Sequence, residues 1–317
     1  MEKSGACRVL FCSGEFIFEL QRDWAKWPAD MENRAVSGIA EHPDGCLYVS
    51  TRSVKYPICV FDRDGTCIRT FGAELNFART HGLTVDLEGN LWICDDPNCV
   101  VYHLDAQGKV LGMLGEKGVA SDSGYDPSVR WPHDLYTNKQ AAAPFNRPTR
   151  MVQAPWGDLY CTDGYGNTAV HRFTAEGTLL RTWGGPGREP GKFRLPHSIA
   201  IDSKERLWIC DRENFLVQIY DKEGTYLTRI EDVGYPSEVC GFGAQMYLCD
   251  GDGCVRILDL DGRQIGEIGY PGCFGNIHSI GADRDGNLYL GRIDNGEDSL
   301  FQLKRCDDFK QKERKNA

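Results

Sequence analysis

The stretch "PHSIAIDSKERLWICDR", residues 196–212, decides the fold. An alternating apolar segment is followed by a polar turn and a second apolar segment, which is the pattern of an antiparallel hairpin. Units of the same design begin near residues 36, 80, 148, 236 and 277, such as "THGLTVDLEGNLWICDD" from Thr80 and "IHSIGADRDGNLYLGRI" from Ile277. Four short strands in a repeat of roughly 40 residues are typical of one blade of a β-propeller.

The remaining strands of each unit follow as hairpins with a glycine in the turn. Examples are "ICVFDRDGTCIRTFG", residues 58–72, and "VQIYDKEGTYLTRI", residues 217–230. We therefore predict an all-β, six-bladed β-propeller that forms one domain over residues 1–317.

The two ends of the chain are predicted to close the ring. The last blade ends in "LFQLKRC", residues 300–306, with no further hairpin, and "RVLFCSGEFIFEL", residues 8–20, is left over at the start. Pairing these segments would cover an open sheet edge. The tail 307–317 is expected to be flexible, and the long loop 116–147 is expected to lie over one mouth of the central channel.

Composition excludes several partners. The net charge of −10 argues against nucleic acid, and no apolar run reaches the ~18 residues that span a membrane. The first residues lack the pattern of a signal peptide. The fourteen cysteines include no C-x-x-C pair. We expect reduced, mostly buried thiols and a cytoplasmic protein.

One position near the start of each unit holds either a histidine or a hydroxyl residue. In chain order it holds Ser37, His81, Thr149, His197, Ser237 and His278. Histidines in alternate blades of a six-bladed ring converge on the axis, and three imidazoles with an open fourth position form a typical catalytic zinc site. The other histidines, His42, His103, His133 and His171, lack this register and are expected in turns or at the surface. His133, in the long loop, is kept as a candidate substrate-binding residue.

A second set of residues follows the second strand of blades 1 to 4: Arg52, Asp96, Gly164 and Arg212. This position predicts side chains at the channel rim. Two arginines beside a metal would bind an anion such as a carboxylate, although ion pairs between blades are an alternative. Tyr165, in "DGYGN", is either a general base or a packed turn aromatic.

The repeats resemble NHL repeats, and over about residues 36–292 the chain resembles the peptidyl-α-hydroxyglycine α-amidating lyases. "HGLTVD", "PHSIAID" and "IHSIGAD" are similar to that family's segments with three zinc-binding histidines. "CTDGYGN" is similar to the segment with the catalytic tyrosine, here Tyr165, and the segments ending at Arg52 and Arg212 are similar to those with active-site arginines. The family also holds a structural calcium, which the backbone carbonyls of Ile39 and Leu83 would share, but its aspartate after the third histidine is Ser279 here.

The resemblance implies a zinc-dependent lyase that cleaves the C–N bond of an α-hydroxyglycine-like carbinolamide to an amide and an aldehyde such as glyoxylate. The expected partner is a small anionic or amide-containing substrate. Two alternatives stay open: a metal-dependent propeller hydrolase or lactonase, and a non-catalytic NHL-repeat scaffold that binds protein. The oligomeric state is left open.

Overall fold

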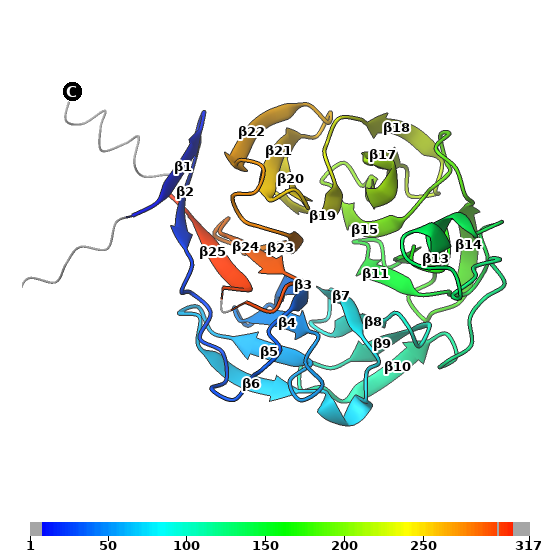
Figure 1. Ribbon diagram of the computed structural model, residues 1–317, viewed down its shortest axis with the longest axis horizontal. Coiled ribbons are helices and arrows are strands. Elements are labelled where there is room, and N and C mark those ends of the chain that lie inside the picture. The colour runs from blue at the N-terminus through cyan, green and yellow to red at the C-terminus, as the bar shows by residue number, and fades with distance from the viewer. Residues whose placement is uncertain (1–7, 297, 307–317) are drawn as a thin grey trace, which may run out of the picture.

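The computed structural model describes residues 8–296 and 298–306 and has six antiparallel sheets around a central channel (Figure 1). The all-β, six-bladed prediction is confirmed. The tail 307–317 lies outside the described residues. Three short 3-10 segments interrupt the strands: η1 (Ala73–Leu75), η2 (His133–Tyr136) and η3 (Arg212–Asn214).

The innermost strands line the channel, and each is hydrogen-bonded to the second strand of its own blade. The innermost strands are β3 (Val36–Glu41), β7 (Thr80–Val85), β11 (Pro148–Gln153), β15 (Pro196–Ile201), β19 (Pro236–Phe242) and β23 (Ile277–Ala282). The second strands are β4 (Leu47–Thr51), β8 (Leu91–Asp95), β12 (Leu159–Asp163), β16 (Leu207–Asp211), β20 (Gln245–Asp250) and β24 (Leu288–Arg292).

The third strand of each blade is mostly buried, and the outermost strand is more exposed. The third strands are β5 (Ile58–Phe61), β9 (Val100–Leu104), β13 (Ala169–Phe173), β17 (Leu216–Tyr220), β21 (Cys254–Asp259) and β25 (Leu300–Arg305). In blades 1 to 5 the fourth strands are β6 (Cys67–Phe71), β10 (Val110–Leu114), β14 (Leu179–Gly184), β18 (Tyr226–Ile230) and β22 (Gln264–Gly269).

Blade 6 is completed from the other end of the chain, as predicted. Its strand order is β1-β2-β25-β24-β23, with β1 (Leu10–Ser13) and β2 (Phe16–Gln21) at the outer edge. Phe18 of β2 lies opposite Arg305 of β25. The Ser13 hydroxyl also accepts a hydrogen bond from the backbone N–H of Glu267 in β22, at 3.0 Å. The N-terminal strands therefore join blades 5 and 6.

The core lies between neighbouring blades. Because both faces of a second strand are covered, the strand is continuously apolar rather than alternating. In β16, for example, Trp208 and Cys210 face blade 5, while Leu207 and Ile209 face blade 3. All thirteen cysteines in the described residues are free thiols. Within the same residues, no helix is long and apolar enough to cross a membrane.

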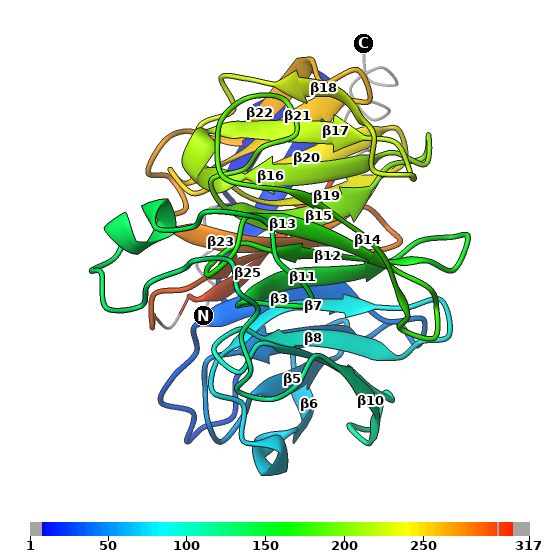
Figure 2. The ribbon, with the colours of Figure 1, turned by 90° about the vertical axis from the view of Figure 1, so that its right-hand side faces the viewer.

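The loop 116–147 lies on one face of the ring, between β10 and β11, where η2 projects from the body (Figure 2). Leu135 of η2 is fully buried against Tyr165 and Leu195. The Ser123 hydroxyl donates to the carbonyl of Gly166 at 2.5 Å. The loop is therefore fixed to blades 3 and 4 rather than free of the body.

Candidate metal centre

Every innermost strand has a β-bulge at the position that the repeats singled out. The pairing of β15 with β16, for example, passes from Pro196 directly to Ser198 and omits His197. The other five strands omit the corresponding residue as well. A bulge re-aims a side chain out of the sheet pattern. Here it turns six side chains, one from each blade, toward the axis.

The three histidines of this ring form a nearly equilateral cluster. Their ring centroids lie 4.8 Å (His81 to His197), 4.9 Å (His81 to His278) and 4.8 Å (His197 to His278) apart. One nitrogen of each lies within 4.8 Å of the other two, and all three rings are buried. Burial is the main cause that lowers the pKa of each imidazole well below its usual value, and the charges of nearby arginines and, for His197 and His278, of the other histidines lower it further. Neutral imidazoles are the form that binds a metal.

Two of the rings are oriented by backbone carbonyls. Nδ1 of His81 lies 2.7 Å from the carbonyl oxygen of Thr149, and Nδ1 of His197 lies 2.6 Å from that of Ser237. A carbonyl only accepts hydrogen bonds, so each Nδ1 carries the proton and each Nε2 keeps a free lone pair. This is the usual outer-shell arrangement of metal-binding histidines.

His278 differs from the other two. Both of its ring nitrogens are buried, and neither has a hydrogen-bond partner among the residues that the structure describes. A buried, unpaired polar nitrogen is costly, and a metal ion on the axis would remove that cost. The three histidines therefore fit a metal ion, and a set of three nitrogens suits zinc.

Tyr165 lies directly on the histidine cluster. Its hydroxyl oxygen is 3.2 Å from Nε2 of His81 and 3.1 Å from Nε2 of His197. Nη1 of Arg212 approaches the same oxygen at 3.4 Å. The phenol is thus within reach of any group bound at the histidines, rather than packed away in its turn.

The two predicted arginines both lie at this end of the channel, but their partners differ. Arg212 is bound to Glu213 at 3.1 Å, and the Tyr235 hydroxyl shares that carboxylate. Nε of Arg52 is buried without a hydrogen-bond partner, and no carboxylate of the described residues forms an ion pair with it. Burial lowers the pKa of Arg52 below its usual value. Among the arginines described at this site, Arg52 is therefore the one that no ion pair occupies.

Sequence reasoning missed two further arginines at the site. The guanidinium carbons of Arg79 and Arg147 lie 5.4 and 5.3 Å from the centre of the Tyr165 ring. Both bind the fully buried Asp96: Nε of Arg79 donates to Oδ1 at 2.7 Å, and Nη2 of Arg147 donates to Oδ2 at 3.0 Å. Each arginine stands two residues before its ring position, so the same register argument applied upstream would have found them.

The channel below the histidines does not suit calcium. A cavity of about 10 Å³ separates the histidines from Arg150 and Glu238, which form an ion pair across the channel. Oε2 of Glu238 also accepts the N–H of Ile280 at 3.3 Å. A guanidinium repels a divalent cation, and Ser279 offers a hydroxyl where a carboxylate is needed. Ser279 thus replaces the expected carboxylate near the carbonyls of Ile39 and Leu83, and Glu238, which lines this cavity, is already paired with Arg150.

The remaining histidines are distributed as follows. His133 is exposed at the start of η2 and is not part of the cluster. His42 and His103 are half-buried. The expectation of a turn or surface position is wrong for His171, which is fully buried in β13. Its ring packs on Phe145, and its nitrogens lie 2.9 Å from Thr182 and 3.3 Å from Asp163.

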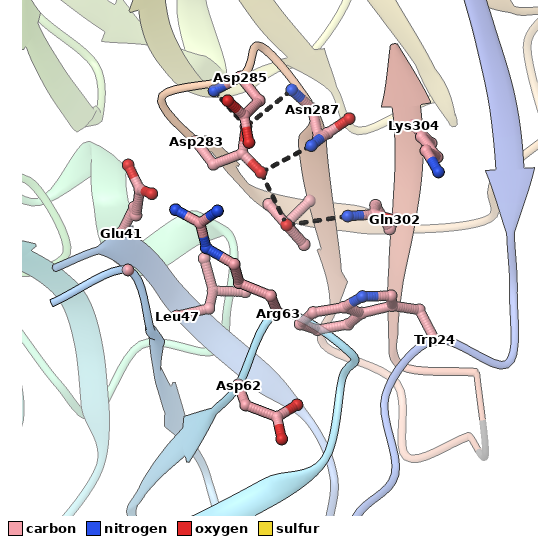
Figure 3. A pocket seen from close by; sticks show the side chains of 12 residues that line it. Trp24, Glu41, Leu47, Asp62, Arg63, Asp283, Asp285, Asn287, Gln302 and Lys304 are labelled. Carbon is pink, nitrogen blue, oxygen red and sulfur yellow. Dashed lines mark hydrogen bonds between the residues drawn. The ribbon is translucent and has the colours of Figure 1, made fainter. Parts of the chain in front are cut away.

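A separate cavity of about 190 Å³ lies at the seam of blades 6 and 1, at the opposite ends of the strands (Figure 3). Its polar groups bind mostly one another: Oδ2 of Asp283 accepts from Asn287 at 2.8 Å and from the Tyr289 hydroxyl at 2.9 Å. Tyr289 in turn accepts from Gln302. The cavity has no part in the metal centre.

The fold and the trio define the class: a six-bladed β-propeller with a buried three-histidine centre. Residues 193–220 match the NHL repeat. The chain is 25% identical to NHL repeat-containing protein 3 of Homo sapiens over 66% of its own length and 58% of that protein. It is 31% identical to a probable peptidyl-α-hydroxyglycine α-amidating lyase of Caenorhabditis elegans over 51% of this chain and 42% of the relative. The chain thus spans about half the length of these relatives.

A third relative covers more of the chain. Peptidyl-α-hydroxyglycine α-amidating lyase 2 of Drosophila melanogaster is 26% identical over 84% of this chain and 71% of its own. Among solved structures, a Xanthomonas campestris gluconolactonase has a TM-score of 0.63 at 18% identity, covering 96% and 99% of the two chains. A streptogramin B lyase has a TM-score of 0.62 at 14% identity, covering 87% and 95%. These two likenesses concern the fold alone.

Proposed function

We propose that the protein is a zinc-dependent lyase that cleaves an N-acyl-α-hydroxyglycine to an amide and glyoxylate. The observation that carries the proposal is the buried trio His81, His197 and His278 with the Tyr165 oxygen 3.1–3.2 Å from two of its nitrogens. The named lyase relatives support the same reaction class.

The metal would supply Lewis-acid polarisation of a substrate oxygen. The residues of the chain do the rest. Tyr165, as phenolate, takes the proton of the substrate hydroxyl. The C–O bond becomes a carbonyl, the C–N bond breaks, and its electron pair goes to nitrogen. The phenol then returns the proton to that nitrogen, which leaves as the amide. No water is consumed.

The anion site orients this substrate. The carboxylate of an α-hydroxyglycine is planar and negative, and Arg52 offers a guanidinium whose buried Nε has no hydrogen-bond partner in the described part of the chain. Arg79, Arg147 and Arg212 add positive charge around the phenol. A carboxylate at Arg52 would place the hydroxyl-bearing carbon toward Tyr165.

The test uses Tyr165→Phe, which removes one oxygen and little volume. We expect turnover of N-acetyl-α-hydroxyglycine to fall at least about a hundredfold, the scale of a general base. Metal content, measured by emission spectrometry, should stay near one zinc per chain, whereas His81→Ala and His197→Ala should lose it. Unchanged turnover in Tyr165→Phe would show that Tyr165 is not the general base. A wild-type protein that hydrolyses lactones but leaves this probe intact would favour the lactonase alternative.

A further inference from the structure

The exposed aromatic side chains of residues 8–296 and 298–306 lie at one end of the ring. Within the described residues, four aromatic side chains are exposed: Trp131 (45%), Tyr136 (62%), Phe215 (51%) and Tyr270 (64%). We call these four residues the aromatic rim. Scattered exposed apolar residues are normal on a protein surface, but a set confined to one face of the molecule is a mark of a binding surface.

Chain topology places the aromatic rim at the end that holds the metal centre. Successive strands of a blade are antiparallel, so its connections alternate between the two ends of the ring. Arg52 and Tyr165 stand in connections from a second to a third strand, as does Phe215. Trp131, Tyr136 and Tyr270 stand in connections from one blade to the next, which lie at that same end. Figure 2 shows η2, which ends at Tyr136, projecting from this face.

Trp131 is the member of the rim closest to the reacting groups. Its ring centroid lies 6.0 Å from that of Tyr165, and the guanidinium carbon of Arg212 lies 5.8 Å from its ring. On its other side Arg212 meets Tyr235 at 5.0 Å, and Phe215 packs on Tyr235 at 5.8 Å. An aromatic surface therefore extends outward from the metal centre on both sides of Arg212.

The position of Trp131 is fixed before any ligand binds. Leu135, four residues on, is fully buried beside Tyr165. The Tyr136 ring is covered by the guanidinium of Arg194 at 4.1 Å, and the buried Asp134 accepts a hydrogen bond from the Tyr125 hydroxyl at 2.8 Å. A rigid, half-exposed indole contributes contact area at little cost in conformational entropy.

We propose that Trp131 is a specificity-determining residue that binds an apolar acyl group of the substrate, with the rest of the aromatic rim extending this acyl site. The inference rests on the proposed lyase function. Cleavage divides the substrate at its C–N bond: the carboxylate half is anionic and belongs with Arg52, and the acyl half is uncharged. The uncharged half points out of the channel, where the surface beside Tyr165 is aromatic.

The experiment compares two probes, N-benzoyl-α-hydroxyglycine and N-acetyl-α-hydroxyglycine, on wild type and on three variants. In Trp131→Ala we expect KM for the benzoyl probe to rise about tenfold with kcat within twofold, and KM for the acetyl probe to change little. Trp131→Phe should keep most of the benzoyl preference. Leu87→Ala, which removes a side chain that is 58% exposed at the opposite end of the ring, should resemble wild type.

A binding measurement separates failure of this inference from failure of the lyase function. N-benzoylglycine and N-acetylglycine lack the hydroxyl and cannot react, so calorimetry reports their affinity alone. Tighter binding of the benzoyl compound that is lost in Trp131→Ala supports the acyl site even if neither probe is turned over. Equal affinities in wild type, or a benzoyl preference that survives in Trp131→Ala, overturn it whether or not the enzyme is active.

Discussion

Arg52 and Arg212 stand at the same end of the channel, yet the structure predicts unequal roles. Arg212 already shares its charge with Glu213, whereas Arg52 has no ion-pair partner among the described residues. We expect Arg52→Ala to raise KM for an α-hydroxyglycine about 30-fold, in line with a charge-assisted hydrogen bond of ~2 kcal/mol. Arg212→Ala should raise KM by a smaller factor. Arg52→Lys should rescue only in part, since the planar fork is lost. Equal effects of the two alanine variants would contradict this assignment.

The histidines also predict how the metal-free protein responds to acid. Their pKa values are lowered by burial in the folded chain, but in the unfolded chain they return to about 6.5. Below that pH the unfolded state binds more protons than the folded state, so stability falls as the pH falls, by up to about 1.4 kcal/mol per pH unit for each histidine. Above a pH of about 6.5 the contribution of the histidines to stability is fully present.

Urea unfolding of the metal-free protein at pH 7.5, 6.5 and 5.5 measures this dependence. His278→Asn removes one titrating group and should reduce the slope. A slope that is the same in wild type and His278→Asn would show that other groups cause the acid sensitivity.

At the scale of elements, Asp96 connects two blades. It follows β8 of blade 2 and binds both Arg79, which precedes β7, and Arg147, which precedes β11 of blade 3. Removing one partner of a buried ion pair leaves the others uncompensated. We expect Asp96→Asn to lower the free energy of unfolding by about 2–3 kcal/mol, and to reduce turnover because both arginines support the Tyr165 ring.

The matched control is Asp158→Asn, which breaks a more exposed pair with Arg172. Its cost should stay below about 1 kcal/mol, as is usual for surface pairs. Chemical denaturation of both variants provides the comparison. Equal losses of unfolding free energy would contradict the role of Asp96 as a connection between blades 2 and 3.

The sequence predicts the elements better than the contacts between their connections. Six repeats with one hairpin pattern define six blades, and the ring register brings His81, His197 and His278 to one point. Arg79 and Arg147 both stand two residues before the ring position of their blade, so the repeat register could have identified them. The connection that holds Trp131 carries no period, so its approach to Tyr165 cannot be read from spacing. The burial of His171 was missed for a related reason. His171 lies in a third strand, and its side chain faces the interface with the preceding blade. A comparison of the first strands gives no information about that interface.

For the whole molecule, the ion pair of Arg150 and Glu238 predicts independence from calcium. The pair joins blades 3 and 5 across the channel and lines the small cavity beside the histidines. We expect the melting temperature to be unchanged by a calcium-selective chelator and by added calcium. A zinc chelator, in contrast, should lower the melting temperature by removing the ligand of the folded state. A calcium-dependent rise of several degrees would show that the carbonyls of Ile39 and Leu83 bind the ion after all.

Because β1 and β2 complete blade 6, the ring can close only after both β2 and its partner β25 have been synthesised. Residues 10–21 are synthesised before the other described strands, but their partner strand, residues 300–305, follows nearly three hundred residues later. At a synthesis rate of roughly 5–20 residues per second, the early strands wait on the order of 15–60 seconds with an unpaired edge. Blades 1 to 5 can meanwhile assemble in order from local contacts. The ring is therefore an open arc until β25 has been synthesised, and during this period the edge of β2 that β25 will cover is open to pairing with other chains.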